Sequence, residues 1–184
     1  MALVPHEGQE IVNRRTGQRM RFVRLREQEL VIESVNPPSD EREPEHVHPE
    51  QESGAEVHAG ALIFEVGGEA RRVGPRESIS IPAGTPHRFW NESDEDARST
   101  QFFRPALDIA AFFETYFELA RRDALTDKGD VPLLQVAVMV PEFAREIRLT
   151  SPPWPVVRAT AALLGPVARM RGHKGRLAFG AEAG

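Results

Sequence analysis

The chain has 184 residues, which is enough for one well-buried domain and too few for two independent enzymatic domains. Its formal net charge is -5, and phosphate binding needs concentrated Lys and Arg, so nucleic acid is not expected as a partner. The chain contains no cysteine, which excludes disulfides, thiolate ligands and cysteine nucleophiles. Any metal must therefore be held by nitrogen and oxygen atoms.

The part of the chain from residue 19 to 104 has the periodicity of strands. Short alternating runs are separated by turns rich in glycine, proline and acidic residues. The runs are RMRFVRL, ELVIESV, AEVHAGALIFEV, ESISIPAG, HRFWN and RSTQFFRPA. The segment VGGE at 66–69 has the paired glycines that a tight hairpin turn favours. This pattern predicts a mainly β fold, either a sandwich or a barrel.

After residue 105 the period of the apolar residues becomes helical. The stretch 109–120 carries one apolar stripe, which predicts an amphipathic helix with Asp108 as its N-cap. Two further helices are predicted at 131–147 and 152–172, and each contains a proline that should kink or interrupt it.

The change of period divides the chain into two parts. We expect a β domain at residues 1–105 and a helical extension at 106–184. Because the extension is rich in apolar residues, it should pack on the β domain or on a partner subunit. The chain shows neither a secretory leader pattern nor an apolar run of about 18 residues, so we expect a cytoplasmic protein without a membrane span.

Two histidine-containing segments carry the chemistry. In HVHPEQESGAEVHAG, residues 46–60, His46 and His48 are one residue apart, so on a strand both side chains leave the same face. In PAGTPHRFWN, residues 82–91, a turn delivers His87 at the start of a new strand. Three neutral imidazoles suit a divalent transition metal: iron, manganese, nickel, copper or zinc.

These two segments resemble the two motifs of the cupin superfamily, which are His-x-His followed by Glu and Gly, and Pro-x-Gly-x-x-His-x-x-x-Asn. The matching residues are His46, His48 and Gly60 in the first motif and Pro82, Gly84, His87 and Asn91 in the second. Arg76 stands where the family's turn usually has glycine. The resemblance covers roughly residues 20–104. It implies a jelly-roll β-barrel with a metal inside, three histidine ligands and often a homodimer.

The family's fourth ligand, a glutamate, has two candidate positions in this sequence. Counting back from Gly60 with the family's spacing reaches Ser53, whereas counting forward from His48 reaches Glu52. A bulge of one residue exchanges the faces of everything beyond it, and Gly54 is a suitable place for one. The local pattern leaves both positions open.

The two positions imply different sites. If Glu52 faces inward, it is a metal ligand and can also act as the catalytic base. The ligand set is then His46, His48, Glu52 and His87. If Ser53 faces inward, the metal is held by three histidines with an open position. The residues expected to line the substrate cavity are Ser53, Ala55, Val57 and Phe89.

The resemblance implies a metal-dependent enzyme that acts on a small organic molecule. A redox metal, with Fe(II) first, leaves coordination positions where substrate and dioxygen can bind, so we expect a dioxygenase-like oxidoreductase. Two alternatives stay open. One is a non-redox isomerase or cyclase, and the other is a non-catalytic protein that binds a small ligand.

Overall fold

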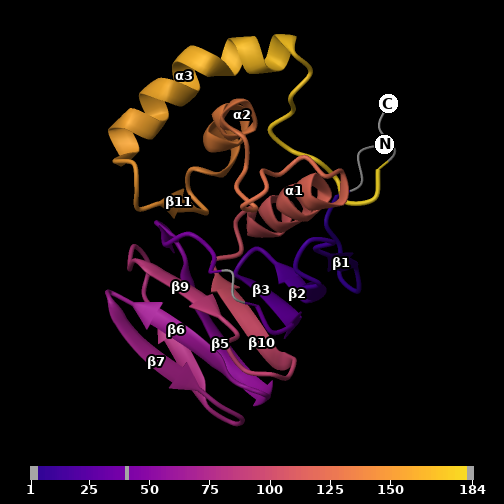
Figure 1. Cartoon of the computed structure of the whole chain (residues 1–184), viewed down its shortest axis with the longest axis vertical. Helices are drawn as coiled ribbons and strands as arrows, with labels where there is room; N and C mark the ends of the chain where they lie inside the picture. Colours follow the sequence, from indigo (N-terminus) through magenta and orange to yellow (C-terminus); the bar gives the residue numbers. More distant parts are fainter. Residues whose placement is uncertain (1–3, 40–41, 182–184) are drawn as a thin grey trace.

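The β part of this protein consists of two antiparallel sheets, and three helices follow it (Figure 1). The computed structural model describes residues 4–39 and 42–181. The first sheet has the order β1 (Glu10–Val12), β2 (Arg19–Arg26), β3 (Glu29–Asn36), β10 (Ala97–Arg104), β5 (Glu52–Ala59) and β8 (Ser78–Ile81). The second has the order β11 (Arg148–Leu149), β4 (His46–Val47), β9 (His87–Trp90), β6 (Leu62–Val66) and β7 (Glu69–Val73).

The prediction of a mainly β fold is confirmed, and the arrangement is consistent with a jelly roll. The expected closed barrel is not formed, because no strand of one sheet pairs with a strand of the other within the described ranges. One reason is strand β4, which is only two residues long. It pairs with β9 along one edge and with β11 along the other, so neither edge is free to pair with the first sheet. The sequence did not indicate β11, which comes from the helical extension.

Among the described residues, two of three apolar clusters include residues of the sheets, and the third joins α1 to α2 through Leu119, Met139 and Phe143. The cluster that joins the two sheets contains Ala55, Val57, Leu62, Phe64, Val73, Ile81 and Ala97. The other joins the first sheet to α1 (Ile109–Arg121), and its buried members are Ile11, Met20, Phe22, Leu30, Ile32, Phe103, Ala106, Ile109, Ala110 and Phe117. Because α1 shares this cluster with β1, β2 and β3, its apolar stripe is buried on the sheet.

The helices lie over one end of the sheets, with α2 (Leu133–Phe143) and α3 (Trp154–Met170) packed on each other (Figure 1). Helix α2 continues for two residues beyond Pro141 and is shorter than predicted. Asp108 is the N-cap residue of α1 as predicted, but its side chain makes no capping bond and instead pairs with Arg176 at 2.7 Å. No helix among the described residues is long and apolar enough to cross a bilayer.

Two turns in the β part bear on the predictions. Gly67 and Gly68 both have positive φ, 58° and 86°, and join β6 to β7, so the predicted hairpin is confirmed. The strand predicted over 55–66 is instead split at Gly60 and Ala61 into β5 and β6. Arg76 adopts φ 68°, the left-handed conformation that glycine takes without steric cost.

Candidate metal centre

The three histidines come from two neighbouring strands of the second sheet. Strand β4 pairs with β9 so that His46 lies directly opposite His87, although the two residues are far apart in the sequence. His48 lies just beyond the end of β4. All three side chains are buried, with 8%, 4% and 4% of their surface exposed for His46, His48 and His87. The pairing of these short strands therefore brings the two histidine segments together.

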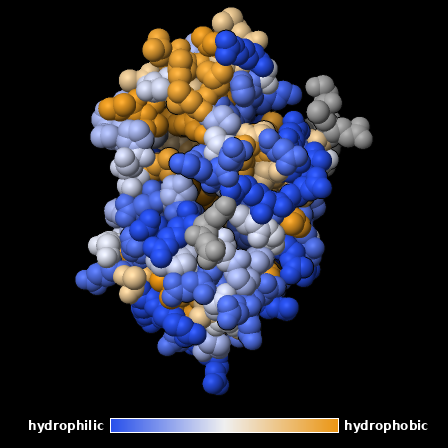
Figure 2. Space-filling view, viewed as in Figure 1, coloured by the Kyte–Doolittle hydropathy of each residue, from blue (hydrophilic) through white to orange (hydrophobic). Residues whose placement is uncertain are grey.

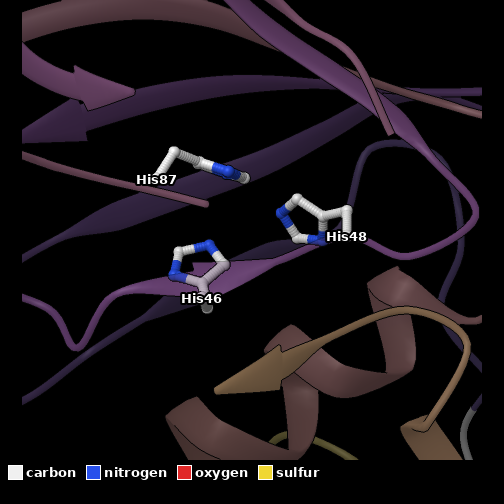
Figure 3. A group of neighbouring side chains, drawn as sticks. All are labelled: His46, His48 and His87. Atoms are coloured by element: carbon white, nitrogen blue, oxygen red, sulfur yellow. The ribbon is translucent and has the colours of Figure 1, made fainter. Parts of the chain in front are cut away.

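The three imidazoles converge on one point (Figure 3). One ring nitrogen from each histidine can be chosen so that the three atoms all lie within 4.8 Å of one another. The ring centroids are 4.5 Å apart for His46 and His87, and 5.1 Å apart for each of the other two pairs. This spacing allows a single ion to be contacted by all three rings.

Backbone carbonyls fix the orientation of each ring. The Nδ1 atom of His46 lies 3.0 Å from the carbonyl oxygen of Pro44, and that of His87 lies 2.8 Å from the carbonyl oxygen of Thr85. The Nδ1 atom of His48 lies 2.6 Å from the carbonyl oxygen of Glu146. A carbonyl only accepts, so each Nδ1 carries the proton and each Nε2 keeps a lone pair in the neutral ring. Metal-binding histidines in proteins commonly show this arrangement.

The surroundings of the three rings keep them neutral. Burial lowers the pKa of His46 and of His87, and it lowers the pKa of His48 to about 3. Proximity to His46 lowers the pKa of the other two rings further, because two adjacent positive charges repel each other. Neutral imidazoles are the form that binds a metal, so the donor set fits a divalent transition metal.

The structure does not bring Glu52 to the three histidines. Its carboxylate accepts a hydrogen bond of 2.6 Å from the hydroxyl of Ser80 on β8, and it is not among the side chains that line the cavity beside the histidines. Ser53 is buried and does line that cavity. The inward-facing position is thus occupied by a serine, and the group of clustered ligands in the described residues holds no carboxylate.

The orientation of β5 has a clear physical cause. Residues 48–51 are not part of a strand, and 49 and 50 form a turn, so the alternation of faces cannot be counted from His48 to Glu52. The irregularity in the pairing of β5 with β10 lies at His58, and none occurs at Gly54. Gly54 has a packing role, because a Cβ atom there would lie 2.3 Å from the carbonyl oxygen of Ile79.

A different carboxylate, Glu43, lies in the cavity. It precedes β4, and its carboxylate accepts a hydrogen bond of 3.1 Å from the backbone N–H of Phe89. Burial raises the pKa of Glu43 to about 7, even though that hydrogen bond and the nearby His87 act in the opposite direction. Glu43 was not predicted as a site residue, since nothing in the acidic segment before His46 distinguishes it from its neighbours.

The histidines open into one cavity of about 550 Å³. From the β domain it is lined by Ser53, Ala55 and Phe89 as expected, whereas Val57 is fully buried in the cluster between the sheets. Other inward-facing residues of the β domain are Phe64, Ile81, Gln101 and Phe103. The remaining wall comes from α1, α2, α3 and the segments between them.

The helical extension also reaches the metal centre itself. Strand β11 pairs with β4, with Leu149 opposite His46. The carbonyl of Glu146, in the same segment, accepts the Nδ1 proton of His48. The Glu146 side chain is held in turn, because its Oε1 accepts a hydrogen bond of 3.2 Å from the backbone N–H of Asp108. The extension therefore orients the imidazole of His48 and pairs with the backbone at His46.

The chain was compared with protein families, curated proteins and solved structures. The family model of the cupin domain matches residues 33–102. A search of the curated proteins gives no match. Among solved structures, KdgF from Halomonas sp. is 22% identical, covers 50% of this chain and 83% of its own, and has a TM-score of 0.47. A sugar phosphate isomerase of the cupin superfamily from Silicibacter pomeroyi is 17% identical, with 56% and 77% covered and a TM-score of 0.46.

A third similar structure is TT1209 from Thermus thermophilus, which is 26% identical, with 47% of this chain and 81% of that chain covered and a TM-score of 0.44.

The segment matched by the family model contains His46, His48 and His87, and it runs from β3 to β10. Residues 33–102 are therefore a cupin domain.

Proposed function

We propose that this protein is a metal-dependent enzyme that acts on a small organic molecule, with His46, His48 and His87 as the metal ligands. The observation that carries the proposal is the set of three buried imidazoles whose Nδ1 atoms are all held by backbone carbonyls. Each such bond fixes one tautomer and aims the free Nε2 atom away from the carbonyl. Rings that only filled space in a core would not need this common orientation.

The reaction proposed first is an oxygenase reaction. A redox-active metal such as Fe(II) would supply the electron transfer that dioxygen chemistry requires, and three ligands leave room for other molecules beside it. The protein's own residues support this role by excluding water. Phe103 lies against His48 at 5.2 Å, and Phe89 stacks on Phe64 with ring centroids 5.4 Å apart, so aromatic rings line the cavity that contains the histidines.

Glu43 favours a second candidate, a non-redox isomerase or cyclase. Its carboxyl group lies in the cavity and has a pKa of about 7, so near neutral pH it can take a proton from a carbon acid and return it elsewhere. In that role Glu43 replaces Glu52, which was the base expected from the sequence. A metal bound at the histidines would then polarise a substrate carbonyl as a Lewis acid.

Metal analysis tests the part that both candidates share. Protein purified without an affinity tag should contain iron, manganese, nickel, copper or zinc near one equivalent, as measured by mass spectrometry. His48→Ala and His87→Ala should lose most of it, whereas Glu52→Ala should keep it, because Glu52 bonds Ser80 instead. Absence of metal after reconstitution, with no difference among these variants, would contradict the proposal and favour a non-catalytic binding protein.

Incubation in air and under argon distinguishes the oxygenase from the isomerase or cyclase. The iron-loaded and zinc-loaded proteins are incubated with a panel of enolisable apolar ketones, in air and under argon. Dioxygen uptake that needs iron and is lost in His87→Ala supports the oxygenase. Product formation that persists with zinc under argon, and falls in Glu43→Gln but not in Glu52→Gln, supports the isomerase or cyclase.

A further inference from the structure

The cavity beside the histidines continues well beyond the cupin domain. Its far end is lined by apolar side chains of all three helices, among them Phe112 and Phe113 of α1, Val136 and Val140 of α2, and Val157 of α3. Figure 2 shows hydrophobic surface gathered over the end of the molecule where Figure 1 draws α2 and α3. The helical extension thus forms a large part of the same binding space that begins at the metal centre.

The part of the cavity wall that β10 forms carries a buried hydrogen-bond donor that has no partner within the described residues. Gln101 lies on β10 and is 5% exposed, and it lines the cavity wall. Its buried Nε2 atom has no hydrogen-bond partner within the described residues. Buried polar atoms are nearly always paired, because leaving one unpaired is costly. This unpaired donor indicates that the ligand of the cavity carries an oxygen acceptor that reaches Gln101.

The size of the cavity is also informative. A volume of about 550 Å³ lies within the range of about 300–1,000 Å³ that is typical of sites for drug-sized ligands. A small polar molecule would leave the helical end empty. Each methylene of a ligand that is buried in that end leaves water, and this should raise the affinity of the ligand by roughly fourfold.

We propose that the ligand of this site is an amphipathic molecule with an oxygen-bearing head and a large apolar body. The head lies against Gln101 and the three histidines, and the apolar body lies between α1, α2 and α3. The inference rests on the proposed function only in taking this ligand to be the substrate. It assigns to the helical extension the choice of substrate, a role that the cupin domain alone does not provide.

A series of straight-chain primary alcohols tests the proposal. Butanol, hexanol, octanol and decanol share one hydroxyl oxygen, which can accept from Gln101, and differ only in the apolar body. Their affinity is measured by isothermal titration calorimetry with the full chain after removal of metal by a chelator. The expected result is a rise of roughly fourfold per methylene until the cavity is filled.

Two variants and a matched control locate the binding. Val140→Trp fills the helical end of the cavity and should abolish the gain for the longer alcohols while leaving butanol little changed. Gln101→Leu removes the donor and should weaken every alcohol by a similar factor, roughly fivefold. The control is Val23→Trp on β2, where the side chain is 44% exposed and does not line the cavity, and it should behave as the wild type.

Affinity that does not change with chain length, or an equal loss in Val140→Trp and Val23→Trp, would overturn the proposal. So would alcohol binding that dissociates an oligomer in sedimentation velocity, since a second copy would then occupy the helical end. The proposed function is judged separately, by binding of acetohydroxamate to metal-loaded protein. Chain-length dependence without any metal binding upholds the amphipathic ligand and refutes the metal-dependent enzyme, while the converse refutes the amphipathic ligand alone.

Discussion

The Nδ1 atom of His48 lies 2.6 Å from the carbonyl oxygen of Glu146, a residue 98 positions later in the chain. The contact joins the histidine cluster of the cupin domain to the segment that follows α2. Because the Glu146 side chain is anchored on the backbone N–H of Asp108, its loss should let this carbonyl move. Glu146→Ala should therefore weaken metal binding by roughly tenfold, measured by competition with a chromogenic chelator.

The matched variant for this prediction is Glu146→Gln, which keeps an oxygen to accept from Asp108 and should retain near wild-type affinity. If Glu146→Gln were as weak as Glu146→Ala, the negative charge near the histidines would matter rather than the anchor, and the positioning role would be refuted. A circular dichroism spectrum and an unfolding curve for each variant separate a local effect from a loss of fold.

The carboxyl group of Glu43 should give the metal-free protein a characteristic pH dependence. Burial raises its pKa from 4.5 to about 7, so between these values the folded state binds a proton that the unfolded state has released. The contribution of Glu43 to stability is therefore fully present below pH 4.5 and is lost as the pH rises through about 7. Glu43→Gln removes this dependence.

Urea denaturation of both proteins across that pH window measures the effect. The free energy of unfolding of Glu43→Gln, minus that of the wild type, should increase with pH between 4.5 and about 7 and then stay level. A difference that is the same at every pH would show that Glu43 titrates alike in the folded and unfolded states. That result would also weaken its assignment as a proton-transferring group.

The left-handed backbone at Arg76 predicts a stabilising substitution. A side chain at φ 68° costs about 1–2 kcal/mol, and glycine avoids this cost while losing some backbone entropy on folding. Arg76→Gly should raise the free energy of unfolding by about 0.5–1 kcal/mol. Arg71→Gly, in the exposed strand β7, is the control and should lower it by a similar amount. Destabilisation by Arg76→Gly would show that the Arg76 side chain compensates for its strain.

Removal of residues 106–184 should give an aggregating protein. The deletion uncovers the apolar cluster that Ile109, Ala110 and Phe117 complete on the first sheet, and it takes β11 away from β4. Size-exclusion chromatography of the truncated chain, next to a sample in which the two fragments are co-expressed, checks this outcome. A soluble and monodisperse fragment 1–105 would mean that the cupin domain does not need its extension.

The resemblance to cupins also implies a homodimer, which stays a prediction. Sedimentation velocity over a range of concentrations measures the oligomeric state directly. The same measurement gives the oligomeric state of the protein in the ligand titrations, because both experiments use the full chain.

The histidine cluster was predictable because its information is local. His46 and His48 are two positions apart, His87 follows a turn of recognisable composition, and both segments fit spaced motifs. The choice between Glu52 and Ser53 was not predictable in this way. It depends on how the chain turns between β4 and β5, and the alternation of strand faces does not pass through a turn.

The rest of the site depends on contacts between distant parts of the chain. Glu43 has a raised pKa because the folded protein buries it next to Phe89, and one glutamate in an acidic segment looks like any other in the sequence. The two-residue strand β11 is too short to have a period. Its role beside β4 is set by tertiary packing, as is the contribution of α2 and α3 to the cavity.

The pairing of β4 with β9 on one side and β11 on the other has a consequence for biosynthesis. The ribosome makes His46 and His48 first and the strand with His87 much later. Glu146, which contacts His48, and Leu149, which lies opposite His46, are made last. A nascent chain can present the imidazoles, but it lacks the contacts that hold them until nearly all of the polypeptide has emerged. Tight metal loading is therefore expected only after translation ends, and prematurely terminated chains should carry no tightly bound ion.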